Sequence, residues 1–288
     1  MLFIGLFTAC SLCAQPFEVE IAGEGRSMIL IPGLSNGGEV WNATVEHFQS
    51  QFECHTLTLA GFAGLPSIGP PFLETVRTGL AQYIRERGLK KPVVVGHSLG
   101  GFLALWLASE EPDLVGPVIS VDGVPYLPAL LDPSATVESA KIQAENIQKY
   151  LASVTKEQFQ IQNKMSLSMM ITDPSIVDSI AVESGKSDPA AVAQATYEVM
   201  TTDLRPCVSS IRTPVLLIGS GAFAKTAEMK EHISTAYRRQ IHSNHHFVLA
   251  ENARHFIMLD DPQFFFNVVE EFLKAPGGTA KMDVGAEK

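Results

Sequence analysis

The chain has 288 residues, of which 46% are hydrophobic and 18% are charged, and its formal net charge at pH 7 is −10. This composition is typical of a folded globular protein and excludes a fibrous, repetitive or broadly disordered chain. The negative charge disfavours nucleic acid as a partner, and no apolar run approaches the ~18–20 residues that a membrane span needs.

The first fourteen residues, MLFIGLFTACSLCA, are apolar and uncharged and end in small residues. This pattern is typical of the apolar part of a secretory signal peptide, with cleavage after Ala14, although no Lys or Arg precedes it. The stretch Phe7-Thr8-Ala9-Cys10 also approaches a bacterial lipoprotein box. We therefore expect a secreted or periplasmic protein. The alternative is that these residues form a buried first strand of a cytoplasmic protein.

Seven short runs rich in β-branched and aliphatic residues predict strands. They are 17–21, 27–33, 53–61, 92–98, 117–123, 214–220 and 246–251. Helical patterns lie between or after them, at 73–88, 99–110 and 262–274. Asp261 is the expected N-cap of the last helix, and Pro262 is its first residue. This alternation predicts a mostly parallel, doubly wound α/β sheet with helices on both faces.

Residues 126–205 interrupt the alternation, because they contain no convincing strand and carry four helical patterns, at 137–152, 155–170, 174–183 and 189–201. We expect an inserted helical cap on a core formed by 15–125 and 206–276, followed by a flexible tail at 277–288. Met165, Met169, Met170 and Met200 lie in the cap. They are either ordinary core or a deformable apolar wall of a binding pocket.

The segment Gly96-His97-Ser98-Leu99-Gly100 carries the strongest chemical signal, since a predicted strand enters it and an apolar helical stretch leaves it. Glycine two residues before and two after a serine permits a tight turn from strand to helix. Such a turn presents the serine hydroxyl at the edge of the sheet, near the N-terminus of the helix. The pattern predicts that Ser98 is a nucleophile.

With this motif, the chain resembles the α/β-hydrolase superfamily over nearly its whole length, apart from the leader and the tail. The expected cap is similar to those of single-domain esterases, C–C hydrolases and haloalkane dehalogenases. The dehalogenases and the related epoxide hydrolases use an aspartate nucleophile, so Ser98 argues against both. The resemblance implies a serine hydrolase.

His255 follows the last predicted strand and precedes apolar residues, an acidic residue, Pro262 and a helix. The catalytic histidine of the family has the same context, which implies that His255 is the general base. The family also implies an oxyanion hole made by two backbone N–H groups, here those of Leu99 and Leu34. Pro32 replaces the histidine that usually opens the second of these loops, which leaves the bracing of the loop open.

The third triad residue is less directly indicated. Most members carry the acid after the strand that matches 214–220, where this chain reads GSGAFAKTAE and has no Asp. A minority place the acid at the end of the preceding strand, where Asp122 lies, so we expect Asp122 to be the acid. The alternatives are Asp203, for which a structural pairing with Arg205 is also expected, and Asp260 at the start of the final helix.

These residues predict two-step hydrolysis of small to medium hydrophobic carboxylic esters, with no cofactor and no metal. Trp41 and Phe62 are expected near the mouth of the pocket. A C–C bond hydrolase or a lactonase would use the same triad. A ligand-binding member of the fold without turnover is a further alternative, favoured by the missing acid after 214–220.

Overall fold

The computed structural model describes residues 16–274, and its centre is a sheet of seven strands in the order β1-β3-β2-β4-β5-β6-β7. The strands are β1 (Phe17–Ala22), β2 (Arg26–Ile31), β3 (Phe52–Leu59), β4 (Val93–His97), β5 (Val118–Val121), β6 (Val215–Ser220) and β7 (His246–Ala250). β1 pairs antiparallel with β3, and every other neighbouring pair is parallel. Parallel pairing brings the carboxyl ends of β4, β5 and β6 to one edge of the sheet.

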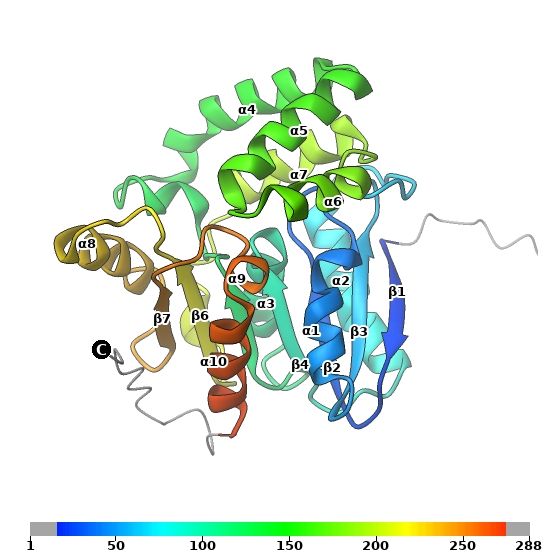
Figure 1. The fold of residues 1–288 in the computed structure, drawn as a ribbon, viewed down its shortest axis with the longest axis vertical. Coiled ribbons are helices and arrows are strands. Elements are labelled where there is room, and N and C mark those ends of the chain that lie inside the picture. Colours follow the sequence, from blue (N-terminus) through cyan, green and yellow to red (C-terminus); the bar gives the residue numbers. More distant parts are fainter. Residues whose placement is uncertain (1–15, 275–288) are drawn as a thin grey trace, which may run out of the picture.

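Both faces of the sheet are covered, which explains the continuous apolar runs in its strands. Successive side chains of a strand point to opposite faces. Ile29 and Ile31 of β2 therefore pack with α2 (Phe72–Glu86) and α3 (Leu99–Glu110), whereas Met28 and Leu30 pack with α1 (Asn42–Phe48) and α10 (Pro262–Lys274). Figure 1 shows the two helix layers on either side of the sheet.

Four helices between β5 and β6 form a separate layer over one end of the sheet, which we call the cap (Figure 1). They are α4 (Val137–Ser153), α5 (Lys156–Met170), α6 (Pro174–Ser184) and α7 (Pro189–Thr201). Each begins with a side-chain N-cap, from Thr136, Thr155, Asp173 and Asp188 respectively. α4 packs on α7, and α5 packs on α6. Because Thr and Asp are preferred N-cap residues, the first residues of these helices could be predicted from the sequence.

The structure confirms the α/β class and all seven predicted strands. The Asp261 side chain accepts the N–H of Phe264 at 3.2 Å, as expected of an N-cap. Three helices were not predicted from the sequence: α1, α8 (Ala227–Arg238) and the short α9 (Ile257–Asp260). The expected signal peptide at 1–14 and the expected tail at 277–288 lie outside the described residues.

No helix within residues 16–274 is both long enough and apolar enough to cross a bilayer.

Trp41 and Phe62 do not lie at the mouth of a pocket, where they were expected, because both side chains are fully buried in the core. Trp41 packs against Phe265 with ring centroids 6.3 Å apart, and Phe62 against Phe72 at 5.5 Å. Neither residue lines the pocket, so this expectation was wrong.

Candidate active site

Ser98 lies in the sharp turn between β4 and α3, with the unusual backbone angles φ 53° and ψ −115°. A residue other than glycine rarely adopts a positive φ, and such strain at a turn is typical of functional sites. The flanking glycines are required sterically. A Cβ on Gly96 would lie 2.1 Å from the Gly100 carbonyl oxygen, and one on Gly100 would lie 2.2 Å from the Ile31 carbonyl oxygen. The turn has the geometry of a nucleophile elbow.

Two backbone donors near Ser98 are free. Leu99 is the first residue of α3, so its N–H has no acceptor within the helix. Within residues 16–274, neither the Leu99 N–H nor the Leu34 N–H takes part in a hydrogen bond. Gly33, which precedes Leu34, lies against the serine, because a Cβ there would approach the Cβ of Ser98 to 3.2 Å. The loop after β2 therefore lies beside Ser98.

His255 and Asp122 form a direct contact, although 132 residues separate them in the chain. The Nδ1 atom of His255 lies 2.6 Å from Oδ2 of Asp122. The Asp122 side chain is 6% exposed and the His255 side chain 26%. Asp122 directly follows β5 and has a positive φ of 54°. Ser98 and His255 line the same pocket, but no hydrogen bond joins the hydroxyl to the ring in the described part of the chain. Such bonds often tighten only when substrate binds.

The other oxygen of Asp122 is held by two donors. Oδ1 accepts the Ser220 N–H at 2.9 Å and the Tyr237 hydroxyl at 2.5 Å. Burial alone would raise the pKa of Asp122, but the hydrogen bond and charge of His255, with the bonds from Tyr237 and Ser220, outweigh burial and lower the pKa. Burial and the neighbouring carboxylate raise the pKa of Tyr237 well above its ordinary value, so its hydroxyl stays protonated.

Sequence analysis did not identify Tyr237. The residue lies on α8, and its ring fits against Gly219 of β6, where a Cβ would lie 2.8 Å from a ring carbon. The only local indication of this contact in the sequence is Gly219, which precedes Ser220. The family usually carries its acid just after this strand.

Replacing Tyr237 with phenylalanine is expected to lower the free energy of unfolding by about 2 kcal/mol near neutral pH, since a hydrogen bond to a charged group contributes about 1.5–3 kcal/mol. This bond lowers the pKa of Asp122. A group with a lowered folded pKa stabilises the protein above its unfolded pKa and loses that contribution as pH falls through its folded pKa.

The stability difference between wild type and Tyr237→Phe should therefore narrow below about pH 4, the ordinary range of a carboxyl pKa. Urea denaturation of both proteins at several pH values from about 7 down to about 2 measures it, because the folded pKa of Asp122 lies below the ordinary carboxyl range. A difference that stays equal over this whole range would contradict this role of Tyr237.

The two alternative acids have other partners. Asp203 pairs with Arg205, whose Nη2 lies 2.6 Å from Oδ2, as expected for a structural pair. Asp260 accepts the N–H groups of Thr172 and Arg254, at 2.8 and 2.9 Å. Within the described residues, neither carboxylate forms a hydrogen bond or an ion pair with the His255 ring.

His97 braces the loop that carries His255. Its ring is buried and packs against Phe256, with centroids 4.4 Å apart. Nε2 lies 3.1 Å from the His255 carbonyl oxygen, which can only accept, so Nε2 carries the proton. Burial, with a smaller contribution from His255, lowers the pKa of His97 to about 3, so the ring stays neutral.

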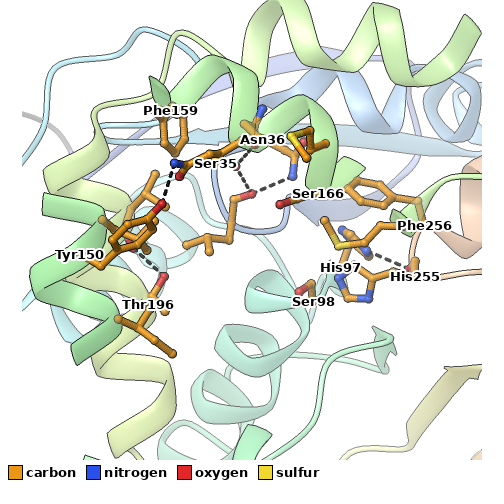
Figure 2. A pocket seen from close by; sticks show the side chains of 18 residues that line it. Ser35, Asn36, His97, Ser98, Tyr150, Phe159, Ser166, Thr196, His255 and Phe256 are labelled. Atoms are coloured by element: carbon orange, nitrogen blue, oxygen red, sulfur yellow. Dashed lines mark hydrogen bonds between the residues drawn. The ribbon is translucent and has the colours of Figure 1, made fainter. Parts of the chain in front are cut away.

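A cavity of about 640 Å³ extends from Ser98 into the cap. Figure 2 shows Ser98, His97 and His255 at one end and Tyr150, Phe159 and Thr196 toward the other. Among residues 16–274, the side chains that line it are mostly apolar or uncharged polar groups, and none is Lys, Arg, Asp or Glu. The cap contributes Ile147, Tyr150, Leu151, Phe159, Gln162, Asn163, Met165, Ser166, Met170, Val192 and Thr196. The pocket therefore suits an uncharged, largely apolar molecule.

The cap methionines have different environments. Met165 and Met170 line the pocket, although Met165 is 66% exposed and therefore lies at its outer wall. Met169 is 67% exposed and does not line it, and Met200 is buried. Of the two interpretations, the pocket wall therefore applies to Met165 and Met170.

Tryptophan at position 165 is expected to reduce kcat/KM for an octanoate ester about 10-fold relative to an acetate ester, because it fills space that a long acyl chain needs. Met169→Trp is the matched control and should leave the ratio unchanged, since Met169 lies outside the pocket. Initial rates with p-nitrophenyl esters of increasing chain length measure both. Identical chain-length profiles for the two variants would remove Met165 from the substrate site.

The family model described as the alpha/beta hydrolase family matches residues 28–268, and the chain belongs to this family. Among curated proteins, the chain is similar to the pimeloyl-[acyl-carrier protein] methyl ester esterase of Aliivibrio salmonicida, with 29% identity over 68% of this chain and 74% of that protein. The esterase of the same name from Legionella pneumophila (strain Corby) is 22% identical over 88% of this chain and 97% of its own length.

Solved structures share the fold at lower identity. An esterase from Exiguobacterium antarcticum superposes with a TM-score of 0.74 at 14% identity, covering 91% of this chain and 98% of that structure. The enol-lactonase from Burkholderia xenovorans gives a TM-score of 0.71 at 18% identity, covering 90% and 96%. These likenesses concern the fold alone.

Proposed function

We propose that the protein is a serine hydrolase that cleaves small to medium hydrophobic carboxylic esters through an acyl-enzyme intermediate. The observation that carries the proposal is the contact between His255 and Asp122, at the pocket that Ser98 also lines. The contact also weighs against a non-catalytic binding protein, because in this proposal Asp122 takes the place of the carboxylate that is missing after β6.

In the proposed reaction, His255 Nε2 takes the Ser98 proton while the hydroxyl oxygen attacks the acyl carbon. The Asp122 carboxylate holds the Nδ1 proton and stabilises the positive charge that forms on the ring. The Leu34 and Leu99 N–H groups donate to the oxyanion. His255 then protonates the leaving alcohol, and the same groups direct a water molecule at the acyl-enzyme.

The substrate class follows from the pocket. Its lining carries no Lys or Arg side chain to pair with an anionic substrate, and its apolar walls suit a hydrocarbon chain. The names of the curated relatives support an ester as the scissile group, since both are methyl ester esterases.

The experiment is a panel of p-nitrophenyl esters, lactones and vinylogous diketones, with Ser98→Ala as the control. The proposal predicts turnover of neutral esters by wild type, with a burst of p-nitrophenol that matches the enzyme concentration if deacylation is slow. Turnover of lactones or diketones without esters would reassign the reaction. No turnover of any compound would favour the binding protein.

A further inference from the structure

The loop after β2 is tied to the cap through Ser35. Ser35 directly follows Leu34, and its backbone has a positive φ of 61°. Its hydroxyl lies 2.7 Å from the Leu34 carbonyl oxygen and 3.2 Å from Oδ1 of Asn163 on α5. Its carbonyl oxygen accepts the hydroxyl of Ser187, in the connection between α6 and α7, at 2.8 Å. The cap therefore contacts Ser35 through both its side chain and its main chain (Figure 2 shows Ser35 in the pocket wall).

Asn163 joins Ser35 to α6 through hydrogen bonds of its side-chain amide. The Ser184 hydroxyl donates to the Ile180 carbonyl at 2.8 Å, so it must accept from Nδ2 of Asn163 at 2.7 Å. The amide oxygen of Asn163 then faces Ser35, whose hydroxyl shares its single hydrogen between this oxygen at 3.2 Å and the nearer Leu34 carbonyl at 2.7 Å. Ser184 is fully buried, which anchors Asn163 to α6.

Ser187 makes a second, independent connection. Its hydroxyl donates to the Ser35 carbonyl and accepts the Ala63 N–H at 2.9 Å. Ser187 is 1% exposed and does not line the pocket. A positive φ at a residue with a side chain costs on the order of 1 kcal/mol or more and persists only where surrounding contacts hold it. The two cap residues supply such contacts at Ser35.

We propose that Asn163 and Ser187 are positioning residues, which hold Ser35 and thereby keep the Leu34 N–H aimed at the oxyanion. The inference rests on the proposed ester hydrolysis. It also accounts for Pro32, which has no side-chain donor with which to brace this loop. The oxyanion hole is then complete only while the cap is docked on the core.

The test compares Ser187→Ala, Asn163→Ala and the double variant with wild type. Ser168→Ala is the matched control, because the Ser168 hydroxyl on α5 bonds, among the described residues, only to the Lys164 carbonyl of its own helix. Loss of an oxyanion donor costs about 10²–10³-fold in kcat, and we expect a smaller loss, about 10-fold, when the donor is only released. Since Ser187 is outside the pocket, the KM of the Ser187→Ala variant should differ from that of wild type by less than about twofold. The double variant should lose less than the product of the single losses, because both act through Ser35.

Two further readouts separate positioning from general stability. The inhibition constant of an aryl trifluoromethyl ketone, whose adduct with Ser98 carries an oxyanion, should rise by the same factor as kcat falls. The rate of inactivation by a fluorophosphonate should fall in parallel. Melting temperatures identify any variant that has lost its fold. If one single variant has unfolded, the other single variant is used to test the inference.

Suppose that wild type turns over esters and that the folded variants have the same kcat, ketone inhibition constant and inactivation rate as wild type. This result would overturn the inference and leave the proposed function intact. If wild type cleaves no ester, the proposed function fails. The rates of fluorophosphonate inactivation then test the inference alone. Slower inactivation of the variants than of wild type supports it. Equal rates, or no labelling of wild type, overturn it.

Discussion

Asparagine in place of Asp122 is expected to lower kcat by as much as about 10⁴-fold while the fold stays intact. The structure dictates how the new amide would sit. Oδ1 of Asp122 accepts from Ser220 and Tyr237, so the amide oxygen must take that position. The NH₂ group then faces His255 Nδ1, which has to accept, and the ring proton moves to Nε2. A histidine with its proton on Nε2 cannot take the proton of Ser98.

Rates of p-nitrophenyl ester hydrolysis by Asp122→Asn and by Asp203→Asn measure this effect. The second variant is the control, because Asp203 pairs with Arg205 and not with His255. Activity of Asp122→Asn within about 10-fold of wild type would show that Asp122 is not the triad acid. Ser98 and His255 would keep their proposed roles in that case.

Alanine in place of Ser98 is expected to reduce kcat about 10³-fold or more, because it removes the attacking oxygen and leaves only the oxyanion hole and substrate binding. The melting temperature should change little, since the hydroxyl faces the pocket and carries no core packing. A variant that keeps wild-type turnover would exclude the acyl-enzyme route. A variant that unfolds would show instead that Ser98 is needed for the turn.

Features set by neighbouring residues were predictable from the sequence. The glycines around Ser98 define the turn locally, and the four cap helices begin at Thr or Asp residues whose side chains cap them. The contact between Asp122 and His255 was expected although it is distant in sequence. The resemblance to the family indicated both residues, and parallel strands, which end on the same side of a sheet, bring the ends of β5 and β7 close together.

Features that depend on packing between distant elements were not predictable. Tyr237 reaches Asp122 because its ring packs against Gly219 of β6, and nothing near Tyr237 in the sequence indicates that partner. Asn163 and Ser187 meet Ser35 only because the cap folds back over the loop after β2. The expected positions of Trp41 and Phe62 were wrong for the same reason. The sequence does not show whether an aromatic residue in a loop near the site faces the pocket or fills the core, and these two fill the core.

The central claim is that Ser98 is a nucleophile activated by His255 and Asp122. The most direct measurement is reaction of the ester-hydrolysing protein with a fluorophosphonate probe, followed by mass spectrometry of its peptides. We predict one probe per chain, attached to Ser98, with no labelling of Ser98→Ala and slower labelling of Asp122→Asn. An active preparation that stays unlabelled, or that carries the probe on another residue while Ser98 is free, would contradict the claim.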